Sequence, residues 1–199
     1  MHPSITAASY DRLAQWYDRT VAATYGLAQL QTALKFVKER KGPALDVGCG
    51  STGRFIEELL QKGFLPEGLD ASAEMLALAR TRHPEVTFHH ADICEWTPPR
   101  TYQFVSAWDS TFHLPLDQQE PVLRKLCDAL APGGVLFFTC GGTDTPGEIT
   151  GVMEGEEMGY STLGVDAFLQ VLREQGCLCR HVEYDQYPEQ HVYIVAQKS

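Results

Sequence analysis

Short apolar runs alternate with amphipathic stretches through the middle of the chain. The apolar runs have the length of buried strands, and the stretches between them carry apolar residues at helical spacing. Strands are predicted at residues 44–47, 66–69, 86–89, 104–108 and 135–140. Helices are predicted at residues 55–62, 72–82 and 116–130. Because strands that alternate with helices form right-handed crossovers, the pattern predicts a parallel sheet with helices packed against it.

The N-terminal segment, residues 1–42, does not continue this alternation and is predicted to form a helical cap. Residues 10–29 carry apolar side chains at helical spacing, and a second helical stretch runs from about residue 27 to residue 41. The Gly42-Pro43 pair then ends the helical pattern. The first predicted strand follows directly.

The C-terminal part of the chain has a different pattern. Residues 141–161 are rich in Gly, Thr, Pro and Glu and are interpreted as a long lid loop. Residues 162–175 are typical of an amphipathic helix, and residues 178–184 and 192–197 are typical of strands. The short connection between those strands predicts an antiparallel hairpin at the end of the sheet. The prediction is one α/β domain with a mostly parallel seven-stranded sheet.

A Gly-rich turn follows the first predicted strand and is the first candidate ligand site. The apolar run ends at Asp46, and Gly48, Gly50 and Gly53 lie between it and the next helix. Without side chains, these positions let a ligand approach the backbone N–H groups at a helix N-terminus. The spacing matches the dinucleotide fingerprint G-x-G-x-x-G.

Two classes of ligand compete for this turn. For a nicotinamide dinucleotide, Asp70 is the acid about 20 residues further on that binds the ribose. Asp46, however, ends the first strand, directly beside the turn. A carboxylate there repels a pyrophosphate and attracts an ammonium or sulfonium group. The turn therefore favours a cationic ligand with an amino-acid part, and an NAD(P)-dependent oxidoreductase remains the less favoured alternative.

Composition narrows the range of partners. The chain has 16 Lys and Arg residues against 26 Asp and Glu residues, a formal net charge of −10, which argues against nucleic-acid binding. We expect no secretory signal and no membrane partner, because no apolar run approaches about 20 residues. The six cysteines lack Cys-x-x-Cys spacing, so we expect free thiols, no metal site and a cytoplasmic location.

Five motifs in order resemble those of the class I S-adenosylmethionine-dependent methyltransferases. The resemblance covers residues 44–140, and no single motif carries it alone. It implies a Rossmann-like three-layer α/β/α fold. The motifs are LDVGCG at 45–50, GLDAS with Met75 and Leu76 at 68–76, HADI at 90–93, FVSAWDS at 104–110 and LAPGGVL at 130–136. One departure is an extra residue between Gly50 and Gly53, since the family commonly has Gly-x-Gly-x-Gly. The role of Gly53 is therefore open.

The resemblance implies a role for each motif in binding S-adenosylmethionine. Asp46 would lie near the methionine ammonium, and Asp70 would accept both ribose hydroxyls. Asp92 would accept from the adenine amino group, with the Ile93 N–H on a ring nitrogen, and Tyr17 would close over the cofactor. The full set implied is Tyr17, Asp46, Gly48, Cys49, Gly50, Asp70, Ala71, Ser72, Met75, Ala91, Asp92, Ile93, Trp108 and Asp109.

Structural roles are open for several of these residues. Asp70 alone could form an Asx-type turn, and Asp92 could start a loop. Met75 at helical spacing is partly a core residue in either case. Tyr17 suits both a lid and a core position. Cys49 could be a reactive thiol near a helix N-terminus, although a small packing residue is the better interpretation.

The resemblance places the reaction centre after the fourth predicted strand. Asp109 and His113 are four residues apart, so a helical segment would place them on one face, where the carboxylate could orient the imidazole. His113 is then the candidate general base, and Asp109 borders the methionine part or the acceptor. Alternatively, His113 only forms a hydrogen bond to a loop. Residues 184–191 are interpreted as a solvated hairpin turn.

The resemblance implies methyl transfer to a nitrogen, oxygen or sulfur atom of a small molecule, with S-adenosylhomocysteine as product. A non-methylating binder of the same cofactor is the main alternative. Acidic residues of the predicted lid favour a cationic or neutral acceptor over an anionic one: Glu148, Glu154, Glu156 and Glu157. We expect a monomer or a homodimer.

Overall fold

The computed structural model describes residues 1–38 and 41–199. The predicted extension of the second helix over residues 39–40 lies outside the described residues. The helices are α1 (Pro3–Thr20), α2 (Leu27–Leu34), α3 (Arg54–Gln61), α4 (Ala73–Arg82), α5 (Leu116–Asp128), α6 (Val165–Glu174) and a short 3-10 helix, η1 (Thr111–His113). The strands are β1 (Gly42–Val47), β2 (Phe64–Asp70), β3 (Thr87–His90), β4 (Tyr102–Ala107), β5 (Leu130–Gly141), β6 (Gly147–Met153), β7 (Glu156–Thr162), β8 (Cys177–Glu183) and β9 (His191–Lys198).

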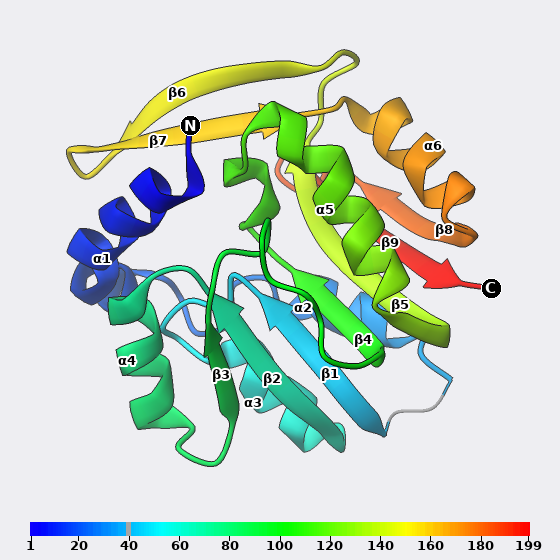
Figure 1. The fold of residues 1–199 in the computed structure, drawn as a ribbon, viewed down its shortest axis with the longest axis horizontal. Helices are drawn as coiled ribbons and strands as arrows, with labels where there is room; N and C mark the ends of the chain where they lie inside the picture. Colours follow the sequence, from blue (N-terminus) through cyan, green and yellow to red (C-terminus); the bar gives the residue numbers. More distant parts are fainter. Residues whose placement is uncertain (39–40) are drawn as a thin grey trace.

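The main sheet has the predicted topology. Its seven strands lie in the order β3-β2-β1-β4-β5-β9-β8. Strands β1 to β5 pair in parallel, whereas β9 pairs antiparallel with both β5 and β8. The β8–β9 hairpin therefore closes one end of the sheet, as the short connection predicted, and the α/β prediction is confirmed (Figure 1).

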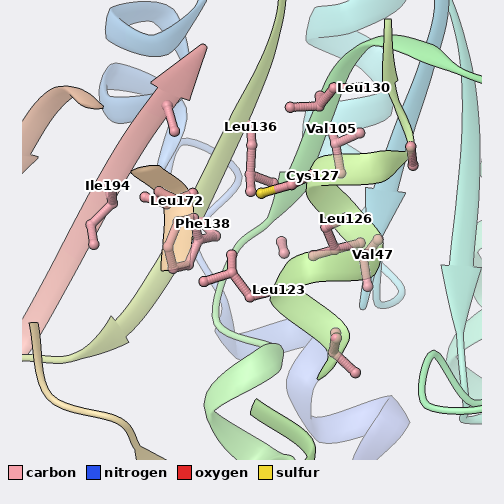
Figure 2. Packing of buried hydrophobic residues seen from close by; sticks show 14 of the residues in the cluster. Val47, Val105, Leu123, Leu126, Cys127, Leu130, Leu136, Phe138, Leu172 and Ile194 are labelled. Carbon is pink, nitrogen blue, oxygen red and sulfur yellow. The ribbon is translucent and has the colours of Figure 1, made fainter. Parts of the chain in front are cut away.

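Each face of the sheet carries its own hydrophobic core, because side chains alternate along a strand. Leu45 and Val47 of β1 pack with α5 and α6, whereas Ala44 packs with α2 and α3 on the opposite face. Figure 2 shows the first of these cores, in which Leu123 and Leu126 of α5 lie against Val47 and Phe138. The structure thus has three layers, with helices on both faces of the sheet.

Helix α1 begins earlier than the apolar pattern predicted and ends at Thr20. Pro3 occupies the first turn, where the backbone N–H has no helical partner. The His2 ring accepts a hydrogen bond from the Ser4 N–H and so caps the helix. The first turns carry few large apolar residues, so helical periodicity could not reveal them. This earlier start matters for function, because those turns reach the cavity described below.

Residues 141–161 are not a loop, which corrects the lid-loop prediction. Most of this segment forms the antiparallel hairpin β6–β7, in which Met153 pairs with Glu156. The two intervening residues, Glu154 and Gly155, have φ values of 50° and 85°. Two consecutive positive φ angles are typical of a type I′ turn, the tight turn that suits the twist of paired strands. The Glu154-Gly155 pair is the sequence signal for this turn, and the lid-loop prediction did not take it into account.

The β6–β7 hairpin packs on α1 through polar contacts. The Ser9 hydroxyl donates to the Glu157 carbonyl, and Arg12 forms an ion pair with Glu156 at 2.5 Å. In Figure 1 the hairpin lies along the top, next to the N-terminus. Within the described residues, no helix combines the length and the apolar character needed to cross a bilayer.

Candidate functional site

A cavity opens at the edge of the sheet where the parallel strands end. Strands β2 and β4 flank β1, so successive connections leave the sheet in opposite directions at this edge. Open α/β sheets bind their ligands at such a reversal. The empty space of the cavity, together with the open solvent at its mouth, is about 990 Å³. The cavity is lined by all but one of the predicted cofactor residues: Tyr17, Asp46, Gly48, Cys49, Gly50, Asp70, Ala71, Met75, Ala91, Asp92, Ile93, Trp108 and Asp109.

Ser72 is the predicted residue that does not belong to this lining. It accepts a hydrogen bond from the Met75 N–H at 3.1 Å and caps α4. Its hydroxyl also donates to the Asp11 carboxylate at 2.6 Å and ties α4 to α1. Because both contacts turn the side chain into the protein, we assign Ser72 a structural role.

The Gly-rich turn requires glycine at two positions, each with a positive φ and a different neighbouring side chain. At Gly48, φ is +68° and an added Cβ would lie 2.2 Å from the Ser110 Cβ, so no side chain fits. At Gly53, φ is +65° and an added Cβ would lie 2.6 Å from the His83 ring. Gly53 starts α3 as its left-handed N-cap residue. Its role, open at the level of sequence, is therefore to pack the start of α3 against His83.

We expect Gly48→Ala to destabilise the fold by about 2 kcal/mol or more. A left-handed alanine costs roughly 1–2 kcal/mol, and the clash with Ser110 adds an overpacking cost. Urea denaturation measures the loss, and Gly133→Ala is a control for strain alone, since an added Cβ there meets no atom within 4 Å. A second substitution, Ser110→Gly, should recover part of the loss. No recovery would contradict the steric explanation.

Asp46 is a buried carboxylate at the end of β1. It is 4% exposed and accepts a hydrogen bond of 2.7 Å from the Ser106 hydroxyl. Burial raises the pKa of Asp46 to about 6, while the Ser106 hydroxyl and the Arg54 charge oppose this rise. The carboxylate is therefore mostly ionised at neutral pH and forms a negative site at the wall of the cavity.

Asp70 holds the Gly-rich turn and lines the cavity with the same carboxylate. One oxygen accepts from the Gly50 N–H and the other from the Ser72 N–H, both at 2.9 Å. Burial raises the pKa of Asp70, and these backbone donors oppose the rise. The Asx-type turn and the position in the cavity are therefore compatible, because a carboxylate has two oxygens with several lone pairs.

The remaining cofactor residues form the walls of the cavity. Asp92 follows β3 and accepts from the Cys94 N–H at 2.9 Å. Met75 is 2% exposed, so it is a core residue that also faces the cavity. Burial raises the pKa of the Cys49 thiol well above its usual value, which favours the packing role over a reactive thiolate.

The predicted pairing of Asp109 with His113 is wrong. His113 lies in η1, with Nε2 2.9 Å from the Tyr10 hydroxyl and Nδ1 2.8 Å from the Gly159 carbonyl. Asp109 instead accepts hydrogen bonds from the Tyr25 hydroxyl and from His191, each at 2.8 Å. Four-residue spacing brings side chains together only in a continuous helix, and η1 is a single 3-10 turn.

The interpretation of residues 184–191 as a solvated turn is also wrong for two of its members. The Asp185 side chain is only 4% exposed, and the His191 side chain is 14% exposed. His191 Nδ1 lies 2.6 Å from the Asp185 carboxylate, while Nε2 contacts Asp109. Burial lowers the pKa of His191, but the hydrogen bonds to the two carboxylates outweigh it and raise the pKa overall. The pair of acids therefore holds a charged imidazolium.

Sequence reasoning missed several cavity residues on α1 and α3. Thr6, Ala7 and Tyr10 of α1 line the cavity, and so does Arg54 at the start of α3. Arg54 donates to the Tyr25 carbonyl and to the Thr52 hydroxyl, each at 2.7 Å. Its position directly after the Gly-rich turn was a usable signal. Nothing in the local sequence of α1 indicated that its first turns reach the cavity.

The acids of the β6–β7 hairpin do not line the cavity, which corrects the electrostatic argument built on them. Glu148 accepts from the Leu116 N–H, and Glu156 pairs with Arg12. Glu154 and Glu157 are exposed. The charge of the acceptor region must therefore be inferred from the residues that line the cavity.

The residues present fit S-adenosylmethionine. At Gly48 the backbone leaves a space that any side chain would fill. The charged and hydrogen-bonding groups of the cavity also match the chemistry of the cofactor. Asp46 supplies a negative charge for an ammonium group, while Asp70 and Asp92 supply acceptors for hydroxyl and amino groups. The lone arginine among these lining residues, Arg54, is bound to the Tyr25 carbonyl and the Thr52 hydroxyl.

Comparison with known proteins agrees with this geometry. Residues 44–134 match the family model described as "Methyltransferase domain". The chain is 38% identical over 97 residues to trans-aconitate 2-methyltransferase of Rhizobium meliloti, covering 48% of this chain and 37% of the relative. It is 31% identical over 111 residues to a dTDP-3-amino-3,6-dideoxy-alpha-D-glucopyranose N,N-dimethyltransferase of Streptomyces fradiae, covering 55% of this chain and 43% of the relative. The chain thus spans about two fifths of the length of these relatives.

Solved structures agree on the fold. The DhpI–SAH complex has a TM-score of 0.75 and 22% identity, covering 100% of this chain and 98% of the other. SAM-bound CalS10, an amino pentose methyltransferase from Micromonospora echinaspora, has a TM-score of 0.71 and 20% identity, covering 94% and 96% of the two chains. These likenesses show the fold of the chain. Residues 44–134 are therefore similar to a methyltransferase domain, and the whole chain has the fold of these solved structures.

Proposed function

We propose that the protein transfers a methyl group from S-adenosylmethionine to a small-molecule acceptor. One observation carries the proposal: the carboxylates of Asp46, Asp70 and Asp92 follow three adjacent parallel strands and line one cavity beside the Gly-rich turn. A dinucleotide pyrophosphate would meet Asp46 as a repelling charge, whereas the methionine ammonium is attracted to it. The relatives' names include aconitate and amino-sugar acceptors, so the small-molecule class is shared while the acceptor differs.

The residues around the cavity have distinct tasks in this proposal. Asp46 binds the ammonium, Asp70 binds the ribose hydroxyls, and Asp92 binds the adenine amino group. Tyr17 and Trp108 exclude water from the wall of the site. The cofactor supplies a methyl group activated on a sulfonium, whose sulfur leaves with the electrons of the broken bond. Because that group is already activated, positioning and exclusion of water supply much of the rate.

Calorimetry with two ligands tests the proposal. S-adenosylhomocysteine should bind with a dissociation constant in the micromolar range, and NADH should not bind at 1 mM. Binding of NADH alone would overturn the proposal. Binding of S-adenosylhomocysteine, followed by the absence of methyl transfer to any member of a broad panel of hydroxyl, amine and thiol compounds, would favour a non-methylating binder.

Cofactor affinity should fall below pH 6, because Asp46 then loses its charge. The pKa of Asp46 is raised to about 6, so protonation occurs below that value and removes the attraction for the ammonium. Between pH 7.5 and pH 5 we expect the affinity for S-adenosylhomocysteine to fall about tenfold. At pH 5, one unit below the pKa, only about a tenth of the Asp46 carboxylates remain ionised. Asp46→Asn should bind weakly at both pH values. An equal pH dependence in the two proteins would exclude Asp46 as its source.

A further inference from the structure

The cavity extends beneath α1 to a part that the proposed cofactor contacts do not use. Thr6, Ala7 and Tyr10 of α1 line this part together with Thr111 and His113 of η1. We name these five residues the α1 subsite. Two hydrogen bonds hold α1 in place above the subsite. The Ser72 hydroxyl donates to the Asp11 carboxylate, and the Ser9 hydroxyl donates to the Glu157 carbonyl of the β6–β7 hairpin. The subsite is therefore preformed, and its chemistry can be read from its lining.

The α1 subsite offers no positive charge to a bound molecule. Burial lowers the pKa of His113, so its ring is neutral at pH 7. The guanidinium of Arg54 lies over the rings of Tyr25 and Phe55, 5.6 Å and 5.1 Å from their centroids. Asp109, which also lines the cavity, is an acidic residue and offers no positive charge either. A carboxylate placed beneath α1 would lose its hydration without gaining a cationic partner, which costs several kcal/mol.

The hydrogen bonds of His113 determine whether the Tyr10 hydroxyl donates or accepts. Nδ1 faces the Gly159 carbonyl, which can only accept, so Nδ1 carries the proton of the neutral ring. Nε2 is then an acceptor, and the Tyr10 O–H must donate to it. The remaining lone pairs of the Tyr10 oxygen can only accept. A molecule that binds Tyr10 must therefore present an O–H or N–H group.

A second polar group of the subsite is without a partner. The Thr6 hydroxyl is buried, with the residue 7% exposed, and forms no hydrogen bond within the described part of the chain. Buried hydroxyls in native proteins are normally paired, and an unpaired one costs about 1–3 kcal/mol. Thr6 lines the cavity as a residue, but its hydroxyl oxygen is closed to solvent in this structure, so the acceptor contact rests on Tyr10.

On the basis of the methyl transfer proposed above, we propose that the acceptor is an uncharged molecule with an O–H or N–H group. This group donates to the Tyr10 oxygen, and Tyr10 and His113 together take its proton. The acceptor's oxygen or nitrogen forms the new bond to the methyl carbon, and the bond between that carbon and sulfur breaks. As the acceptor's proton moves to the Tyr10 oxygen, the Tyr10 proton moves to Nε2 of His113. The positive charge lost from sulfur thus reappears on the imidazole ring.

A panel of small probes, of which benzyl alcohol, aniline and benzoate are similar in size, tests the charge preference. Benzyl alcohol and aniline are uncharged at pH 7.5, whereas benzoate and trans-aconitate are anions. Ligand-observed NMR on the protein saturated with S-adenosylhomocysteine should show the uncharged probes bound at least tenfold more tightly than either anion. Equal or tighter binding of an anion overturns the inference, as does failure of both uncharged probes. Failure of S-adenosylhomocysteine itself to bind would instead contradict the proposed function.

Thr6→Lys should reverse this preference. A lysine at this position places a positive charge in the α1 subsite. The affinity for benzoate should therefore rise at least tenfold, and the affinity for benzyl alcohol should fall. Ile5→Lys is the matched control, because Ile5 is 51% exposed on the same helix and does not line the cavity. It should leave both affinities unchanged. An equal gain for benzoate in both variants would show a general charge effect and contradict the inference.

Tyr10→Phe isolates the hydroxyl without a large change in packing. We expect at least a fivefold loss of affinity for benzyl alcohol and no change for S-adenosylhomocysteine. The nitrogen chemical shift of His113 Nε2 should change as well, because its donor is removed. Tyr187→Phe is the control, since Tyr187 is 83% exposed. An unchanged affinity for benzyl alcohol in Tyr10→Phe would remove Tyr10 from the proposed contact.

Discussion

Asp70→Ala is expected to lower the affinity for S-adenosylhomocysteine by about 100-fold. The carboxylate has two tasks that are lost together. It would bind the ribose hydroxyls, and it accepts hydrogen bonds from the Gly50 and Ser72 N–H groups of the turn that forms the site. Hydrogen bonds to a charged group contribute roughly 1.5–3 kcal/mol each, and about 2.7 kcal/mol corresponds to 100-fold.

Two variants separate these tasks. Asp70→Asn keeps one carbonyl oxygen as an acceptor, so it should retain more of the turn geometry and lose less affinity than Asp70→Ala. Glu95→Ala removes an exposed carboxylate near the next motif and should not change binding. Calorimetry gives the affinities and urea denaturation gives the stabilities. A normal affinity in Asp70→Ala would exclude the residue from the cofactor site.

His191→Ala should destabilise the protein by about 3 kcal/mol at pH 6. The imidazolium lies between the carboxylates of Asp109 and Asp185, and its removal leaves two poorly solvated charges close together. Removing one partner of a buried ion pair typically costs about 3–5 kcal/mol, and the exposure of 14–19% at His191 and Asp109 favours the lower end. Loss of the Asp109 contact should also disturb the cavity wall.

The contribution of His191 should depend on pH in a defined direction. Its folded-state pKa is raised above the ordinary value of 6.5. A raised pKa means that the folded protein binds the proton more tightly, so the stabilisation is complete below about pH 6.5 and is lost as pH rises through the folded pKa. Urea denaturation from pH 6 to pH 9 should show this decline in the wild type.

A matched substitution provides the control for this pH dependence. His191→Ala should lose the His191 contribution to the decline, whereas His90→Ala should retain it, because His90 is exposed and contacts only the Ala71 carbonyl. If His191→Ala and the wild type had parallel pH profiles, the stabilisation would have another source. If His191→Ala were as stable as the wild type at pH 6, the two carboxylates would not need the imidazolium.

The sequence by itself determined the sheet and predicted which residues at the ends of its strands would gather at one edge. Alternating apolar runs and amphipathic helices predict parallel strands, and the residues that follow parallel strands meet at one edge of the sheet. Asp46, Asp70 and Asp92 could therefore be grouped before any coordinates, because each is positioned by its own strand. The β6–β7 hairpin was not predicted, because β6 has no buried residue and the turn between the strands is signalled only by the Glu154-Gly155 pair.

Only the tertiary structure decided the acceptor half of the site. Tyr10 meets His113 across 103 residues, and Asp109 meets His191 across 82 residues. The sequence pattern instead suggested that Asp109 would pair with His113, its near neighbour. A buried hydrogen-bonding group takes whichever partner packing brings within reach, and sequence spacing limits that choice only inside one regular element. The proposed cofactor residues lie mostly at the ends of such elements, whereas the residues of the α1 subsite come from α1 and η1, which are far apart in the sequence.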